Sequence, residues 1–254
     1  MTEKITSPSN PKIKKLLALQ QKSSERRESG LFVVEGRREL EHCMAAGYEV
    51  EAVFTLGDAP DAPRRFEVTP EVYGRIAYRE GTEGVIAEVK ARNLTLQDLR
   101  LKENPLIVVL ESVEKPGNLG AVLRSADAAG ADAVIICDPL TDLYNPNLIR
   151  ASIGAVFTVP TVACSSEDAI AFLKERGIQI LTAQLQDSAL YYDCDMTRGT
   201  AIVMGTESTG LTPVWRKAAD RHIRIPMLGQ LDSLNVSVSA AILLFESVRQ
   251  RNNG

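Results

Sequence analysis

The sequence predicts an α/β protein in which a C-terminal domain with a mostly parallel sheet follows a smaller α/β domain. From Leu106 onward, apolar runs such as LIVVLES and ADAVIICD alternate with helix-like segments, a pattern typical of buried parallel strands joined by helices. Before residue 104, shorter strand-like and helix-like segments alternate, and ARNLTLQDLRLKENP has the character of a connector. We therefore expect domains at residues 1–103 and 104–254.

The elements of the N-terminal domain follow from capping residues and hydrophobic periodicity. NPKIKKLLALQ begins with Asn and Pro before Ile13, Leu16 and Leu19 at helical spacing, which predicts a helix. GLFVVEG predicts a strand that ends in a turn, and RRELEHCMAAG predicts a helix that ends at Gly47. The remaining expected elements are strands in VEAVFTL and GVIAEVK and a helix in VYGRIAY.

The C-terminal domain is expected to be doubly wound, with helices on its sheet. Ligands of such sheets bind beyond the carboxyl ends of the strands, so the loops that follow the strands are the places to search for a site. The expected strands lie in LIVVLES, ADAVIICD, VFTVPTVAC, IQILTAQL, TAIVMGTE and IRIPM, and the expected helices in AVLRSADAAG, SSEDAIAFLKERG and VSVSAAILLFESVRQRN.

Composition favours an ordinary soluble protein and excludes several kinds of site. The chain has 254 residues, of which 44% are apolar and 24% charged, as in common globular domains. Its start lacks the pattern of a secretory signal, and no apolar run approaches the roughly 20 residues that span a bilayer, so we expect a cytoplasmic protein without membrane contact. The four cysteines form no C-x-x-C pair, and His42 and His222 are the only histidines. We therefore expect neither a bound metal nor a histidine-based triad.

The charge distribution is uneven. The net charge is −4, but residues 1–38 hold nine Lys or Arg and four Glu, a local charge of +5, while the remainder carries −9. Such a basic region either binds phosphates or is an ordinary lysine-faced surface helix, and charge alone does not decide between them.

The first candidate site segment, KPGNLGAVLRSADAAG, follows a predicted strand. Its glycines are expected to form a tight turn around Asn118. The segment lacks the Walker and dinucleotide patterns, so it does not predict a phosphate cradle. Arg124 follows among apolar residues, where a charge needs a partner or solvent. It either serves a ligand or pairs with Asp127 or Asp132.

Two further loops follow apolar strands. In AIVMGTESTGLTPVW, Gly205 and Gly210 frame a turn that displays Glu207, and the alternative is a plain strand-to-helix turn. In HIRIPMLGQLDSLNVSVSAAILLFES, Ser233 or Asn235 either caps the last helix or contributes to a site. Because all three loops follow strands of one predicted sheet, we expect them to converge at one edge.

Three segments of the chain resemble, in their order and spacing, the three motifs of the SpoU/TrmH family of RNA 2′-O-methyltransferases, which belongs to the SPOUT superfamily. The three segments are PGNLGAVLRSADAAG, MGTESTGL and IPMLGQLDSLNVSVSAAILLFE. The resemblance covers residues 105–251. Residues 6–90 look like the small RNA-binding domain that precedes it in many members, on the strength of NPKIKKLLALQ and FVVEGRRELEHC. The resemblance to this family implies a catalytic domain with a trefoil knot, S-adenosyl-L-methionine as cofactor and a homodimer formed through the catalytic domain.

The resemblance also assigns residues to roles. Arg124 is implied to act on the ribose, either as the base or as an electrostatic stabiliser of the developing alkoxide. The implied catalytic residues are Asn118, Arg124, Glu207, Ser233 and Asn235. The implied cofactor-binding residues are Met204, Gly205, Thr206, Ile225, Met227, Ser233 and Leu234. The candidates for contact with RNA phosphates are Lys12, Lys14, Lys15, Arg26 and Arg27.

The function predicted from this resemblance is methylation of a ribose 2′-hydroxyl in RNA, with ribosomal RNA favoured over transfer RNA as the substrate. One alternative is a catalytically silent RNA-binding or ribosome-assembly protein of the same fold. Another is an unrelated α/β enzyme that acts on a small nucleotide-like substrate.

Overall fold

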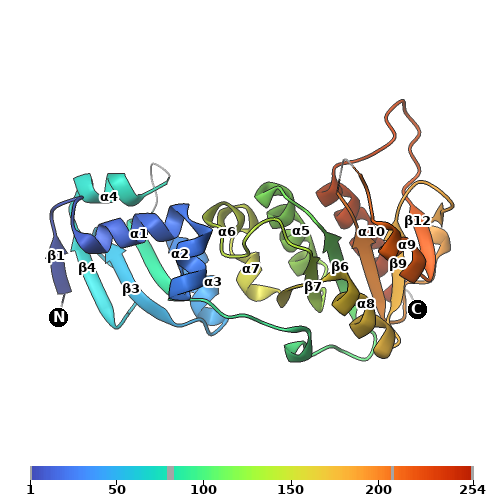
Figure 1. The fold of residues 1–254 in the computed structure, drawn as a ribbon, viewed down its shortest axis with the longest axis horizontal. Coiled ribbons are helices and arrows are strands. Elements are labelled where there is room, and N and C mark those ends of the chain that lie inside the picture. Colours follow the sequence, from blue (N-terminus) through green and yellow to red (C-terminus); the bar gives the residue numbers. More distant parts are fainter. Residues whose placement is uncertain (1, 79–82, 207–208, 253–254) are drawn as a thin grey trace. The chain divides into compact units, whose positions relative to one another are not determined.

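The computed structural model describes residues 2–78, 83–206 and 209–252, and the chain forms two compact units (Figure 1). The first unit combines residues 1–92 with 142–158, and the second combines residues 93–141 with 159–254. No helix in the described part of the chain is long and apolar enough to span a membrane.

The first unit contains a five-stranded mixed sheet in the order β1-β4-β3-β5-β2. The strand β4 pairs in parallel with β1 and β3, whereas β5 is antiparallel to β3 and β2. Its elements are β1 (Thr2–Ile5), α1 (Pro11–Gln21), α2 (Ser23–Ser29), β2 (Leu31–Glu35), α3 (Arg37–Ala45), β3 (Val50–Thr55), β4 (Arg64–Val68), α4 (Pro70–Ile76), β5 (Val85–Lys90), α6 (Pro146–Ser152) and α7 (Ala155–Thr158).

The first helix forms as its sequence predicts. The side chain of Asn10 accepts a hydrogen bond from the Lys12 amide, and proline occupies the first turn, where its missing amide costs nothing. Ile13, Leu16 and Leu19 are fully buried and pack into the core of this unit. The predicted helix is therefore confirmed, and its spacing of apolar residues explains its orientation on the sheet.

Residues 142–158 pack with the first unit, although the strands before and after them belong to the second sheet. The rings of Phe32 and Tyr144 stack with centroids 4.2 Å apart, and the ring of Phe157 lies 5.8 Å from that of Phe32. The strand predicted for VFTVPTVAC is wrong in its first half, because Ala155–Thr158 forms the helix α7. The predicted domain boundary near residue 103 stays a prediction.

The second unit contains a seven-stranded sheet in the order β10-β12-β9-β11-β6-β7-β8. Every strand pair found in the described part of this sheet is parallel, as predicted. Its elements are η1 (Leu96–Asp98), β6 (Leu106–Glu111), α5 (Pro116–Ala128), β7 (Ala133–Cys137), β8 (Thr161–Cys164), α8 (Ser166–Glu175), β9 (Gln179–Ala183), β10 (Ala189–Leu190), η2 (Tyr191–Asp193), β11 (Thr200–Met204), α9 (Pro213–Ala218), β12 (Arg221–Arg224) and α10 (Val236–Asn252).

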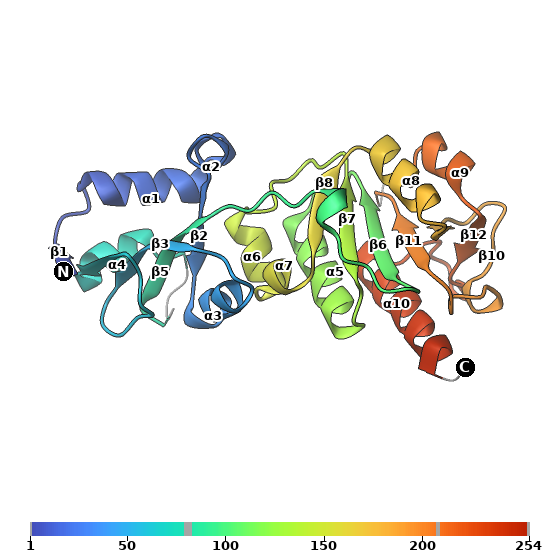
Figure 2. The same ribbon diagram turned by 90° about the horizontal axis from the view of Figure 1, so that it is seen from below.

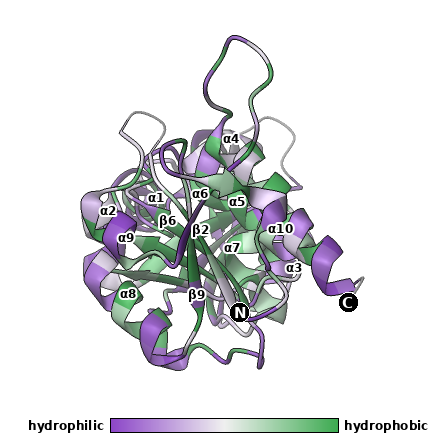
Figure 3. Ribbon diagram, turned by 90° about the vertical axis from the view of Figure 1, so that its right-hand side faces the viewer, coloured by the Kyte–Doolittle hydropathy of each residue, from purple (hydrophilic) through white to green (hydrophobic). Residues whose placement is uncertain are grey.

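Helices cover both faces of this sheet. In Figure 2, α8 and α9 lie on one side of the strands, and α5 and α10 lie on the other. Phe172 of α8 and Trp215 of α9 join Ile107 and Val203 of the sheet in one buried cluster. The central strands carry the most hydrophobic colours in Figure 3, which agrees with the complete burial of β6. The long apolar runs in the sequence thus become strands that are shielded on both sides.

One local expectation in this unit is wrong. The glycines of KPGNLG were expected to form a tight turn, but the helix α5 already begins at Pro116 and includes both of them. Proline favours the first turn of a helix because its φ is already suitable. The unusual backbone conformation lies earlier instead, at Ser112, with φ 51°. The predicted α/β fold class is confirmed, and the trefoil knot stays a prediction.

Candidate active site

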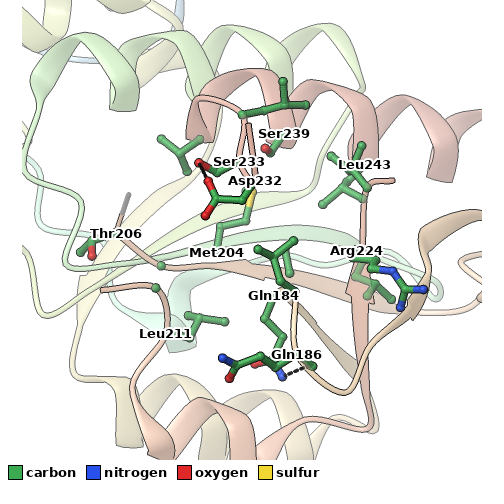
Figure 4. Close-up of a pocket in the computed structure, with 18 of the residues that line it drawn as sticks. Gln184, Gln186, Met204, Thr206, Leu211, Arg224, Asp232, Ser233, Ser239 and Leu243 are labelled. Atoms are coloured by element: carbon green, nitrogen blue, oxygen red, sulfur yellow. Dashed lines mark hydrogen bonds between the residues drawn. The ribbon is translucent and has the colours of Figure 1, made fainter. Parts of the chain in front are cut away.

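A pocket of about 440 Å³ opens at the carboxyl ends of β9, β11 and β12 (Figure 4). Its walls come from residues 183–186 at the end of β9 and beyond, from residues 204–206 and 209–211 at the end of β11 and beyond, and from residues 223–225 and 227 at the end of β12 and beyond. The start of α10 and the segment before it complete the lining. The loops of the second and third predicted site segments therefore meet, where ligands of parallel sheets normally bind.

The loop after β11 is built around a very close approach of two glycines. A Cβ atom on Gly205 would lie 2.3 Å from the carbonyl carbon of Gly210 and 2.6 Å from the amide nitrogen of Leu211. Gly210 has φ +67°, a conformation that side chains disfavour. Its amide donates a 3.0 Å hydrogen bond to the carbonyl of Thr206. Only glycine at position 205 permits this tight loop. The predicted site residue Glu207, which belongs to the same loop segment, lies outside the described residues.

A buried carboxylate anchors the far end of the same loop. Glu111, the last residue of β6, is only 3% exposed. Its oxygens accept hydrogen bonds from the amide of Thr212 at 2.8 Å and from the hydroxyl of Thr212 at 2.5 Å. Glu111 was not predicted from the sequence as a site residue. The signal was available, since an acidic residue ends an otherwise wholly apolar strand and a buried charge needs partners.

The first and third predicted segments meet through two asparagines that lie far apart in the sequence. The Asn235 Nδ2 donates a 3.1 Å hydrogen bond to Asn118 Oδ1. The Asn235 Oδ1 accepts hydrogen bonds from the amide of Ser237 at 2.9 Å and from its hydroxyl at 2.6 Å. Asn235 thus caps α10 and also joins that helix to the first turn of α5. Both interpretations that the sequence allowed for Asn235 are compatible with this geometry.

Arg124 is exposed on α5, and no ion pair of its guanidinium is found within residues 2–78, 83–206 and 209–252. Asp132, one of the two partners considered from sequence, pairs instead with Lys102 at 3.3 Å and accepts a hydrogen bond from the Leu106 amide at 2.9 Å. The structural alternative of a salt bridge to Asp132 is therefore wrong.

The residues implied by resemblance to hold the cofactor share one location. All of them line the 440 Å³ pocket: Met204, Gly205, Thr206, Ile225, Met227, Ser233 and Leu234. They come from three separate segments, and three of them, Met204, Thr206 and Ser233, are labelled in Figure 4.

Gln184 is a pocket residue that sequence reasoning missed. Its Nε2 donates a 2.9 Å hydrogen bond to the carbonyl of Gln186, which fixes the orientation of the amide (Figure 4). The Gln184 Oε1 is buried and has no hydrogen-bond partner in the described part of the chain. A buried acceptor without a partner costs about 1–3 kcal/mol. A ligand with an N–H or O–H group would remove that cost.

Neither histidine lies in the pocket. His222 Nδ1 is 2.6 Å from the hydroxyl of Thr182, and His42 Nδ1 is 3.1 Å from the carbonyl of Ile153. Among the described residues, no group of three or more His, Cys, Asp or Glu side chains is arranged to hold a metal ion.

The lysines predicted to contact RNA lie on α1 with different surroundings. Lys12 pairs with Glu3 at 2.6 Å, and Lys15 pairs with the buried Glu88 at 2.8 Å. Lys14 is exposed. Lys14 forms no ion pair among the described residues. Of these three lysines, it can therefore reach a phosphate without breaking one.

The two predicted arginines differ more sharply. Arg26 is only 6% exposed. Its Nε donates to Asp142 Oδ2 at 2.6 Å and its Nη1 donates to the Leu19 carbonyl at 2.6 Å. Arg27, the next residue, is exposed. The structure gives Arg26 a role in holding residues of the first unit together, so we leave it out of the RNA-contacting set proposed below.

A parallel sheet with a ligand-sized pocket beyond the carboxyl ends of its strands defines an α/β domain that binds a small molecule. The matches to family models define the protein more narrowly than this class. Residues 105–245 match the SpoU rRNA methylase family, and residues 10–87 match the MRM3-like substrate binding domain. The chain belongs to the SpoU rRNA methylase family, so the family predicted from the three motifs is confirmed.

Individual relatives agree with this assignment. The chain is 39% identical over 181 residues to the 23S rRNA (guanosine-2′-O-)-methyltransferase RlmB of Vibrio vulnificus, which is 69% of this chain and 73% of the relative. A crystal structure of an RNA 2′-O ribose methyltransferase is 40% identical, with a TM-score of 0.85, and the match covers 98% of this chain and 99% of that one. The AdoMet-bound rRNA methyltransferase of Sinorhizobium meliloti is 30% identical, with a TM-score of 0.90 and 98% of both chains covered.

Proposed function

We propose that this protein transfers a methyl group from S-adenosylmethionine to a ribose 2′-hydroxyl of ribosomal RNA. The observation that carries the proposal is the meeting of the three family segments. The second and third segments line one pocket, and Asn235 joins the third segment to Asn118 of the first. The RlmB relative acts on 23S rRNA, and the Sinorhizobium relative was crystallised with the same cofactor.

The pocket residues fit this cofactor chemically. Leu211, Ile225 and Leu234 supply apolar surface for a flat adenine ring. The unsatisfied oxygen of Gln184 suits an amino or hydroxyl group of the ligand. Ser233 offers a hydroxyl at the pocket wall. Bound there, S-adenosylmethionine supplies a methyl group on a sulfonium, which is already activated for transfer.

The chain then has to orient the acceptor hydroxyl and stabilise the charge that develops on its oxygen. We assign the second task to Arg124, whose exposed guanidinium is available to a ribose or phosphate oxygen. A guanidinium stays protonated in proteins, so stabilisation suits it better than proton removal. Asn118 and Asn235 are proposed to hold the acceptor side of the site, with Ser233 beside them and Glu207 as a further polar group.

We propose that the first unit binds the RNA through its phosphates. Lys14 on α1 and Arg27 on α2 are both exposed, so they are the best candidates in the basic N-terminal region. Lys12 and Lys15 would have to exchange their glutamate partners for phosphate. Contacts of this kind weaken steeply as salt rises, because counterions are released on binding.

We also propose that the protein is a cytoplasmic homodimer formed through the catalytic domain. The helix α10 exposes large apolar side chains, with Val238 46% and Phe245 48% exposed, and Leu234 just before it is 38% exposed. Grouped apolar exposure of this kind is typical of an interface. Sedimentation of the wild type and of Phe245→Lys tests this, since a charged side chain at such an interface should favour monomers.

The function is tested by transfer of radiolabelled methyl groups to unmodified 23S rRNA. Arg124→Ala should retain cofactor affinity by calorimetry and lose at least about 100-fold in rate, the scale of one oxyanion-stabilising donor. Arg176→Ala removes an exposed arginine at the C-cap of α8; it serves as the matched control and should behave as the wild type. A 2′-deoxyribose at the modified nucleotide should yield no product.

Three outcomes would contradict the proposal in different ways. Wild-type turnover of Arg124→Ala would remove its role. Methylation of transfer RNA with none of 23S rRNA would change the substrate. Tight binding of cofactor and rRNA without any transfer would instead support a catalytically silent RNA-binding protein.

A further inference from the structure

An exposed aromatic ring stands out on the first unit. Tyr78, two residues beyond the end of α4, is 69% exposed, and among the exposed large apolar side chains in the described structure only Leu228 and Leu231 exceed it. A single exposed apolar residue is ordinary on a protein surface. What distinguishes Tyr78 is that its ring is held in place from one side.

The ring is fixed by a buried ion pair. The guanidinium carbon of Arg150, on α6, lies 3.7 Å from the centre of the Tyr78 ring. The Arg150 Nη1 lies 3.7 Å from Glu35 Oε2, and their side chains are only 9% and 5% exposed. The Tyr78 amide donates a 2.9 Å hydrogen bond to the other oxygen of the same carboxylate. Glu35 therefore positions both the backbone of Tyr78 and the cation stacked on its ring.

Arg150 thus lies against one face of the Tyr78 ring, while the residue as a whole is 69% exposed. A stacked cation polarises an aromatic ring and restricts its motion. Immobilising an exposed side chain costs conformational entropy in the free protein, but it lowers the cost of binding a partner that stacks on it. The geometry is that of a preorganised platform for a flat molecule.

A second feature lies beside the platform. Tyr78 and Arg150 line a cavity of about 270 Å³ in the same unit. Its walls are apolar at Leu17 and Val33 and polar at Gln20, whose Nε2 donates to the Ile76 carbonyl at 2.8 Å. Amides can read the edge of a base, and an aromatic ring or an arginine plane can stack on its face. The lining also includes Arg75, which can attract a phosphate.

We propose that the Tyr78 platform and this cavity bind one unpaired base of the RNA substrate, with the base stacked on the ring face opposite Arg150. The proposal rests on the function proposed above. A nucleotide suits the site better than other flat ligands because it combines a π face, a hydrogen-bonding edge and an adjacent anion, and the site offers a counterpart for each.

The test uses the full-length protein and unmodified 23S rRNA transcript, with affinity measured by filter binding over a series of salt concentrations. Tyr78→Ala should weaken binding by about 5-fold to 150-fold, the range for loss of one base stack. Tyr78→Phe keeps the ring and should bind as the wild type. The slope of affinity against salt should stay unchanged in both, because no phosphate contact is lost.

Lys14→Ala serves as the contrasting control. Loss of a phosphate contact should flatten the salt dependence by about one unit of slope. Tyr78→Trp adds a readout that does not depend on the alanine variant, since a stacked base should quench the fluorescence of the new indole when the transcript is added. Trp215 is fully buried and supplies a constant background.

Wild-type affinity of Tyr78→Ala, equal losses in the alanine and phenylalanine variants, or unquenched Tyr78→Trp fluorescence would each overturn the platform. A changed salt slope in Tyr78→Ala would reassign the region to phosphate binding and would overturn it as well. These results are separable from failure of the proposed function, because a wild-type protein that binds cofactor and methylates 23S rRNA keeps that function even if the platform fails. Absence of transfer by the wild type would instead refute the function.

Discussion

Gly205→Ala is the sharpest test of how the pocket is built. In the structure, the Cβ of an alanine would lie 2.3 Å from both the carbonyl carbon and the carbonyl oxygen of Gly210. Ordinary contacts of a Cβ begin at 3.4 Å, so these backbone atoms would have to move by about 1.1 Å. No flexible side chain can absorb the displacement, because the opposing atoms belong to the main chain.

The size of the effect follows from that displacement. Overpacking of a tight site costs about 1–3 kcal/mol of stability. A misplacement of about 1 Å in a positioned binding group lowers activity by about 100-fold. Since Thr206 and Leu211 flank the displaced backbone and also line the pocket, we expect Gly205→Ala to remain folded and to lose about 100-fold in cofactor affinity.

The assay is calorimetric titration of S-adenosylmethionine into the full-length variant, together with its thermal unfolding. Gly74→Ala is the matched control, because it lies in α4 with ordinary φ and no atom within 4 Å of the added Cβ. Removing a helical glycine should leave affinity unchanged and raise stability by up to about 1 kcal/mol. Wild-type cofactor affinity in Gly205→Ala would refute the argument that this close approach shapes the pocket.

Three further predictions concern other parts of the second unit. Glu111→Gln replaces one of the two carboxylate oxygens that accept from Thr212 by an NH2 group that cannot accept, so the apparent KM for cofactor should rise about 10-fold or more with a smaller change in kcat; an unchanged KM would remove its positioning role. Hydrogen bonds from Arg249 lower the pKa of Glu246, so their contribution to stability is present above about pH 4.5, the unfolded value, and lost as pH falls through the lower folded pKa. Thermal unfolding from pH 7 to pH 3 should show a smaller acid loss in Glu246→Gln, and parallel curves would contradict this. Iodoacetamide should alkylate the half-buried Cys164 before the three buried cysteines, as peptide mass mapping can check.

Much of the fold was predictable because its helices and strands depend on local sequence patterns. The buried strand β6 and the helix α1 follow from apolar runs and capping residues that act over a few positions. Local patterns also misled where two structures share the same composition. The Val- and Phe-containing start of VFTVPTVAC suits a strand, but residues 155–158 are helical and pack against the aromatic residues of the first unit.

The motifs likewise located the pocket segments, but not how they fit together. The sequence could place Asn118 and Asn235 in two loops, yet only the folded chain shows one side chain donating to the other across 117 positions. It marked Arg26 as a basic surface residue, whereas the structure buries it against Asp142. In both cases the partner lies far away along the chain.

The features that the sequence determines differ from those that only the folded chain determines for a simple physical reason. The sequence by itself determined the order of the elements, the parallel character of the second sheet and the family, because these depend on periodicity and on short motifs. Tertiary structure alone decided the support of the β11 loop by Glu111, the assignment of residues 142–158 to the first unit and the cation behind Tyr78. Each of these depends on which distant groups share a buried space, where a charge or polar atom must find its partner.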